Sequence, residues 1–165
     1  MAHCAPPHRG LSTRLGRVIG LIAALPIILL YMSSSWADTC TGYDVVTAAP
    51  SVTTDMGHGL KVTGLKSQSV LLSNDSIYNL VSGECAGAML QTPDGKIQLE
   101  GYCVRHDKAG DIFSTAWSQA PSADKGEWKA TGGTGKYAGK RDSGWWQVLY
   151  ADPKVVVSKW GGDCH

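Results

Sequence analysis

The sequence has no run or stripe of basic residues, so its charge pattern does not suggest a polyanionic partner. Lysine and arginine together number 15, and aspartate and glutamate number 14. Three of the arginines precede Asp38, which leaves 12 basic against 14 acidic residues from that point on, a net charge of −2. Nucleic acid and anionic membrane surfaces are therefore not expected partners.

Acidic residues are also missing from the first 37 positions. Three arginines there precede an apolar stretch over 18–32, about 15 residues long, whereas a membrane-spanning helix needs roughly 20. Ser35-Trp36-Ala37 then places small residues at −3 and −1. This pattern predicts a cleaved signal peptide over 1–37 and export to a bacterial periplasm or the medium, without stable membrane insertion. The alternatives are an uncleaved N-terminal anchor and, less favoured, a lipoprotein, for which Thr39 before Cys40 is a poor match.

Beyond the leader, residues 38–165 are long enough for a single domain with one core. No Cys-x-x-Cys spacing occurs there, so we predict no metal site, no thiol chemistry and no cofactor. The remaining cysteines are Cys40, Cys85, Cys103 and Cys164. An even number in an exported chain predicts two disulfides, for which three pairings exist.

One hairpin selects among those pairings. Cys85 and Cys103 each lie nine residues from Asp94, the centre of a Thr-Pro-Asp-Gly turn. In a hairpin folded at that turn, the two cysteines face each other at about the spacing that a disulfide requires. The sequence therefore predicts Cys85–Cys103, which leaves Cys40–Cys164 to join the two ends of the domain.

Helical periodicity is scarce after residue 38, and short runs rich in Val, Ile, Thr, Tyr and Trp alternate with Gly, Pro, Asp and Asn. The predicted strands span 43–48, 60–65, 69–72, 78–90, 96–106, 112–119, 127–131, 144–150 and 154–160. Eight or nine strands with short links and no crossover helix favour an all-β antiparallel sandwich or barrel.

Period-two alternation in the hairpin separates a face with small residues and the cysteines from an aromatic face. A next turn centred on 107–110 would pair Glu100 with Trp117, so that Glu100, Tyr102, Phe113 and Trp117 share the aromatic face. We predict that these four residues line a ligand pocket. A register slip of one residue would exchange the two faces.

A glycine-rich turn dominates the C-terminal third of the chain. Its glycines, Gly132, Gly133, Gly135 and Gly139, lie between two aromatic runs and predict a sharp, bulged corner of the sheet. Nucleotide-binding loops do not fit. The first glycine of a phosphate-binding loop would fall on Ala130, and a dinucleotide fingerprint would need a helix where another strand is predicted.

This turn resembles one found in allene oxide cyclases and plant dirigent proteins, and it is similar to small exported bacterial proteins of unassigned function. The matching positions are Gly132, Gly133, Thr134, Gly135, Lys136, Tyr137 and Gly139. The pattern departs at Asp142, where those families commonly have another glycine. The resemblance implies a small eight-stranded antiparallel β-barrel whose central cavity takes an apolar ligand. It carries over no catalytic residue.

Other motifs offer little chemistry. Residues 107–111 lack the alternate oxygen ligands of a calcium loop, and no Gly-x-Ser-x-Gly elbow occurs. We therefore expect an exported barrel that binds a small, partly apolar ligand in its lumen without catalysis. The alternatives are an isomerase or cyclase that uses the same cavity, and an interaction module with a filled lumen. The sequence does not indicate an oligomeric state.

Overall fold

The computed structural model describes residues 39–49 and 51–165, and the predicted signal peptide lies outside them. These residues form nine strands and one short 3-10 turn, η1, at Gly135–Tyr137. The strands are β1 Cys40–Ala48, β2 Val52–Gly57, β3 Leu60–Ser73, β4 Val81–Gln91, β5 Ile97–His106, β6 Ile112–Gln119, β7 Gly126–Gly133, β8 Ser143–Ala151 and β9 Val155–Asp163.

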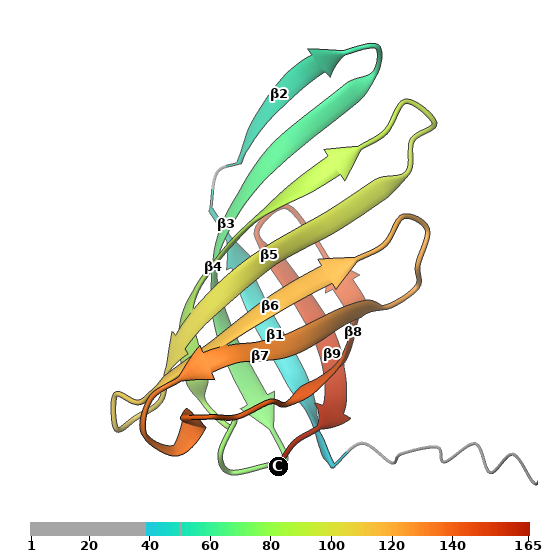
Figure 1. The fold of residues 1–165 in the computed structure, drawn as a ribbon. Helices are drawn as coiled ribbons and strands as arrows, with labels where there is room; N and C mark the ends of the chain where they lie inside the picture. Colours follow the sequence, from blue (N-terminus) through green and yellow to red (C-terminus); the bar gives the residue numbers. More distant parts are fainter. Residues whose placement is uncertain (1–38, 50) are drawn as a thin grey trace, which may run out of the picture. The chain divides into compact units, whose positions relative to one another are not determined.

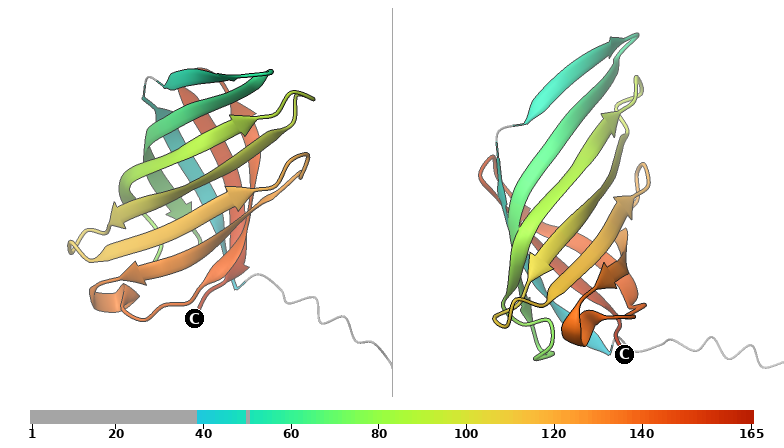
Figure 2. Two further views of the ribbon diagram at one scale, coloured as in Figure 1. Left: turned by 45° about the horizontal axis from the view of Figure 1, so that its top comes forward. Right: turned by 60° about the vertical axis from the view of Figure 1, so that its left-hand side comes forward.

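Eight of these strands form a closed antiparallel barrel (Figure 1). Each of β3 to β8 pairs with the next strand in sequence, and β1 pairs with β9 on one side and β3 on the other. The all-β barrel predicted from the sequence is thus confirmed. The strand β2 stands outside the ring, pairs only with β3 among the described strands, and is exposed along its length. Figure 2 shows the β2–β3 hairpin projecting beyond the rim.

Three of the differences between the predicted strands and the structure have a physical reason. The strand β2 was not predicted, because its threonine-rich residues bury no face and so give no alternation. The strands predicted at 60–65 and 69–72 are one continuous strand, β3. The strand predicted from residue 78 begins only at Val81, because Tyr78 lies in the connection that precedes β4.

Both predicted disulfides are confirmed. Cys85 and Cys103 are direct partners in the β4–β5 register, with Cα atoms 4.0 Å apart. Cys40 and Cys164 join the first strand of the ring to the segment that follows the last strand, with Cα atoms 5.8 Å apart. Two disulfides are typical of chains that fold in an oxidising compartment. None of the helical segments within 39–49 and 51–165 has the length and apolarity needed to cross a membrane.

One end of the barrel is closed by a packed aromatic floor. Tyr78 enters from the β3–β4 connection and Tyr137 from η1, while Phe113 and Trp160 come from β6 and β9. The ring centroid of Phe113 lies 5.0 Å from that of Tyr78 and 5.2 Å from that of Tyr137. The four packed aromatic side chains fill this end of the barrel and exclude solvent from it.

Candidate functional site

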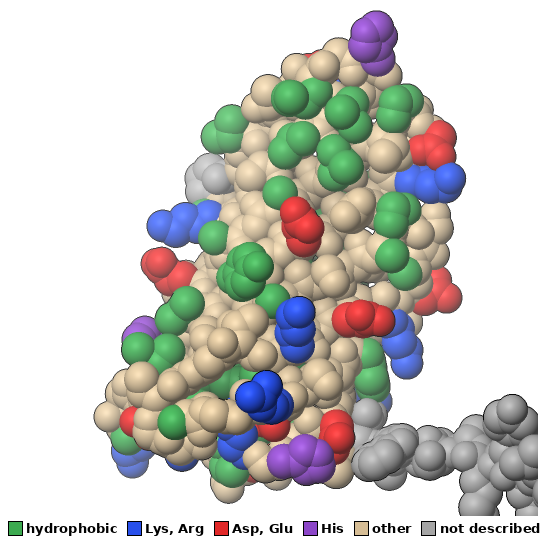
Figure 3. All heavy atoms as spheres, viewed as in Figure 1, with side chains coloured by type: hydrophobic (Ala, Val, Ile, Leu, Met, Phe, Trp, Pro, Cys, Tyr) green, Lys and Arg blue, Asp and Glu red, His purple; other side chains and the backbone are tan. Residues whose placement is uncertain are grey.

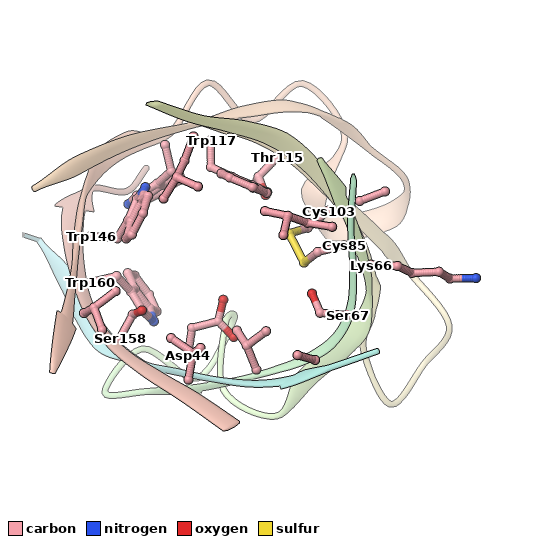
Figure 4. A pocket seen from close by; sticks show the side chains of 18 of the residues that line it. Asp44, Lys66, Ser67, Cys85, Cys103, Thr115, Trp117, Trp146, Ser158 and Trp160 are labelled. Atoms are coloured by element: carbon pink, nitrogen blue, oxygen red, sulfur yellow. A yellow bond between two sulfur atoms is a disulfide. The ribbon is translucent and has the colours of Figure 1, made fainter. Parts of the chain in front are cut away.

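The barrel lumen above this floor contains a cavity of about 780 Å³ (Figure 4). Its upper wall is apolar and includes Leu65, Met89, Leu99 and Val156. Tryptophans line the wall as well, from four different strands: Trp117 on β6, Trp128 on β7, Trp146 on β8 and Trp160 on β9. The volume lies within the range of small-molecule sites, about 300–1,000 Å³.

Inward-facing glycines make room for these tryptophans. A Cβ at Gly87 or Gly101 would collide with the Trp117 indole, and one at Gly126 would collide with Trp146. A Cβ at Gly42 would likewise collide with the Trp160 indole. Each indole therefore lies over the wall of a neighbouring strand, where a larger side chain would push it into the lumen.

A buried ion pair lies at the base of the cavity. Arg105 on β5 and Asp44 on β1 face inward, and their Nη2 and Oδ2 atoms are 2.8 Å apart. Their side chains are 6% and 18% exposed. Arg105 is therefore largely desolvated and depends on protein partners.

The rest of the guanidinium is also bonded. Its Nε donates to Ser69 Oγ at 2.8 Å and its Nη1 to Thr115 Oγ1 at 3.1 Å. Ser69 in turn donates to Asp44 Oδ1 at 2.6 Å. The cluster ties β1, β3, β5 and β6 together across the lumen, and it presents polar atoms at the end of a mostly apolar cavity.

The predicted pocket residues do not share one face. Glu100 and Tyr102 point outward, and Tyr102 is 65% exposed, whereas Phe113 and Trp117 face the lumen. The predicted pairing of Glu100 with Trp117 is wrong: Trp117 pairs with Gly101, and Glu100 with Ser118. The lumen therefore lies on the cysteine face, and whether any of the four binds a ligand remains a prediction.

The reason is the β5–β6 turn. Asp107 donates its backbone N–H to the Asp111 carbonyl, which leaves a loop of three residues, 108–110, whereas the predicted turn over 107–110 leaves a loop of only two. Gly110 takes a φ of +88° in that loop. The additional residue shifts the register by one and exchanges the faces of β6.

Glu100 and Tyr102 instead border a hollow on the outer surface. Its floor is made of small residues on neighbouring strands, among them Ala86, Ala88 and Ala116. On the face of the described residues seen in Figure 3, acidic, basic and hydrophobic side chains are interspersed.

The glycine-rich turn supports the floor rather than the cavity. Gly135 and Gly139 have φ angles of +52° and +75°. A Cβ at Gly133 would collide with Ile112 O and with Tyr137, so backbones pass closely there. The turn carries Tyr137 into the floor, where its hydroxyl donates to Ile77 O at 2.6 Å. Burial raises the pKa of Tyr137.

Asp142, the position that departs from the resembled motif, has a structural role. It is almost fully buried and accepts a hydrogen bond from the Tyr78 hydroxyl. Its other oxygen accepts from the His165 backbone N–H at 3.1 Å. Burial, followed by the hydrogen bond to Asp142, raises the pKa of Tyr78 well above its ordinary value. Tyr78 is therefore neutral and holds the floor closed.

Asp44 and Arg105 were not among the predicted site residues. Arg105 follows Cys103 by two positions and so shares its face, which is the one signal in the sequence that could have identified it. Nothing in the sequence around Asp44 indicates a partner more than sixty residues away. Within the described residues, no three His, Cys, Asp or Glu side chains are grouped as metal ligands would be.

No protein-family model and no curated protein matches this chain. Similar solved structures include a pterocarpan synthase dirigent protein, 15% identical with a TM-score of 0.48, over 81% of this chain and 96% of that one. A second pterocarpan synthase dirigent protein is 13% identical with a TM-score of 0.47, over 77% of this chain and 94% of that one. A protein of unknown function from Clostridium acetobutylicum is 10% identical with a TM-score of 0.49, over 76% of this chain and 96% of that one. The first two are dirigent proteins, the family that the glycine-rich turn resembles.

Proposed function

We propose that this protein binds a small, partly apolar ligand in the barrel lumen and does not transform it. The observation that carries the proposal is the cavity of about 780 Å³, which is apolar near its rim and ends at the buried Asp44–Arg105 pair. Apolar walls supply affinity, and a few fixed polar groups supply orientation. An empty space of this size is at odds with the alternative of a filled lumen.

The bonding of the ion pair favours binding over catalysis. A general acid or base needs a titratable group within reach of the ligand and free to exchange a proton. Asp44 already accepts from Arg105 and Ser69, and Arg105 donates to Asp44, Ser69 and Thr115. Recovery of a chemically altered ligand after incubation would favour the isomerase or cyclase alternative instead.

Two neighbouring residues of β3 allow a matched test. Ser67 lines the lumen, whereas the Lys66 side chain points away from it (Figure 4). Ser67→Trp should fill part of the cavity, and Lys66→Trp should add the same side chain outside. With a neutral naphthyl ketone dye as probe, we expect Ser67→Trp to weaken binding at least tenfold and Lys66→Trp to leave it unchanged. Equal binding by both variants would contradict a luminal site.

We also propose that the chain is exported. Its two disulfides support this, because such bonds persist in oxidising compartments. Fractionation of the host followed by N-terminal sequencing tests the proposal, with a mature N-terminus at Asp38 as the expected result. A reduced, full-length protein in the cytoplasm would contradict it.

A further inference from the structure

Two polar side chains lie directly opposite each other near the base of the cavity. Ser158 on β9 and Asp44 on β1 are partners in the β1–β9 register, and both line the lumen. Residues paired in this way have Cβ atoms about 4.5–5.5 Å apart. Figure 4 shows both side chains on the same side of the lumen. A single ligand group that reaches the base of the cavity can therefore contact both.

The Ser158 hydroxyl is available to a ligand. Within residues 39–49 and 51–165, it neither donates a hydrogen bond nor accepts one. The only fully buried side-chain nitrogen or oxygen without a partner in that part of the chain is Trp160 Nε1, so the unpaired Ser158 oxygen is accessible from the cavity that it lines. An apolar ligand seated on this hydroxyl would shield it from water and leave it unpaired, which is costly.

The Asp44 carboxylate can accept further hydrogen bonds but has no proton to donate. Its Oδ1 accepts from Ser69 and its Oδ2 from Arg105, and each oxygen has a second lone pair. Asp44 is 18% exposed against 6% for Arg105, so a ligand reaches the carboxylate more readily than the guanidinium. A ketone, ether or ester oxygen brings only lone pairs, and these would face the lone pairs of Asp44. The ligand group at this point must therefore be a hydrogen-bond donor.

The charges of the lumen favour a neutral donor. Asp44, Arg105 and Lys66 are the charged residues that line the described cavity. Asp44 and Arg105 neutralise each other, and the Lys66 side chain points away. A ligand carboxylate would lose its hydration and face Asp44 without a free cation. A ligand ammonium would lose its hydration beside a carboxylate whose charge Arg105 already balances.

We propose that the natural ligand is a neutral alcohol whose hydroxyl group donates to Asp44 and accepts from Ser158. An alkyl hydroxyl suits this double role better than a phenol, whose oxygen is a weaker acceptor because its lone pair is delocalised into the ring. The apolar body of the ligand lies against the tryptophans of the cavity wall, among them Trp117 and Trp146. This inference rests on the proposed function and narrows it to one ligand class.

Six probes that share a naphthalene ring separate the possibilities: 2-naphthalenemethanol, 2-ethylnaphthalene, 6-methyl-2-naphthol, 2-acetylnaphthalene, 2-naphthylmethylammonium and 2-naphthoate. The first two have nearly the same shape and differ in a hydroxyl for a methyl group, and the naphthol is an isomer of the alcohol. We expect the alcohol to bind the wild-type protein at least as tightly as the more hydrophobic hydrocarbon. It should bind at least threefold more tightly than each of the other four. Competition with the naphthyl ketone dye at pH 7 measures all six.

Ser158→Ala removes the donor and keeps the rest of the wall. It should weaken binding of the alcohol about three- to tenfold relative to the hydrocarbon, the effect of one neutral hydrogen bond. Ser118→Ala makes the same change on the outer surface, where Ser118 borders the hollow, and it should leave the binding of both probes unchanged.

Equal effects on alcohol and hydrocarbon in Ser158→Ala, or a different ranking of the six probes, would overturn the inference while leaving luminal binding intact. If Ser158→Ala does not fold, the ranking on the wild-type protein decides. Failure of all six to bind the wild-type protein would overturn the proposed function itself.

Discussion

Trp117 on β6 lies directly opposite Gly101 on β5, and its indole occupies the space that a side chain at Gly101 would need. The same ring also covers Gly87 on β4. The two glycines hold the tryptophan against the wall, and this keeps the middle of the lumen open for a ligand.

Gly101→Ala should therefore destabilise the protein. The new methyl group would meet the Trp117 ring and the Ala86 carbonyl, and overpacking of this kind costs about 1–3 kcal/mol. Urea unfolding measures the loss. Gly64→Ala is the control, since a Cβ there meets only Val52 O, at 3.9 Å. It should change stability by no more than about 1 kcal/mol, and in the stabilising direction.

The Asp44–Arg105 pair predicts a strong asymmetry between single and double substitutions. Asp44→Asn leaves the Arg105 charge buried without a counter-ion, and we expect a loss of about 3 kcal/mol or more. Combining Asp44→Leu with Arg105→Met removes both charges and should cost clearly less than the sum of the single changes. Additive losses in chemical denaturation would show that the pair does not act as a unit.

The disulfides should contribute unequally. Cys40 and Cys164 are separated by 124 positions and Cys85 and Cys103 by 18. The loop-closure argument gives about 4–5 kcal/mol for the long loop and about 3 kcal/mol for the short one. Replacing both cysteines of each pair with alanine should therefore lower the denaturation midpoint further for Cys40–Cys164. The reverse order would mean that residual structure in the unfolded chain outweighs loop length.

Acid stability should depend on Asp107. Its Oδ2 lies 2.7 Å from Lys136 Nζ, and the hydrogen bond to this ammonium group lowers the pKa of Asp107. Its stabilising effect is then complete above the unfolded-state pKa, near 4, and is lost as the pH falls through the lower folded-state value. Asp107→Asn should reduce the melting temperature at pH 7 and flatten its decline below about pH 4.

Lys136→Met provides the matching partner for that experiment. It removes the ammonium group and leaves most of the alkyl chain, so its melting curve against pH should follow that of Asp107→Asn. If Lys136→Met retains the full acid decline, the contact with Lys136 is not the cause of that decline.

The β4–β5 hairpin could be predicted in register because its turn residues are unambiguous and the cysteines are symmetric about them. The register of the β5–β6 hairpin could not be predicted, because two loops fit the same sequence. One has two residues, 108–109, and the other has three, 108–110, with Gly110 in the left-handed region. The choice between them depends on Asp107, whose carboxylate accepts the backbone N–H groups of Ala109 and Asp111. That single local preference decides which face of β6 meets the lumen.

The polar base of the cavity also escaped prediction, for a related reason. Polar residues interrupt the hydrophobic pattern of β3, and residues 66–68 were predicted to separate two strands, at 60–65 and 69–72. Ser67 and Ser69 face the lumen, where the Ser69 hydroxyl donates to Asp44 and accepts from Arg105. Such residues become interpretable only once the strands that carry their partners are placed next to them.

Closure of the ring has a consequence for how the chain is made. During synthesis β1 emerges early, but one of its two neighbours, β9, is the last of the strands. Pairing over so great a sequence distance is slow. Until β9 is available, β1 and β8 each expose an unpaired backbone edge, the kind of edge through which chains aggregate. The nascent protein is thus most vulnerable just before completion, and loss of its last strand would make that vulnerability permanent.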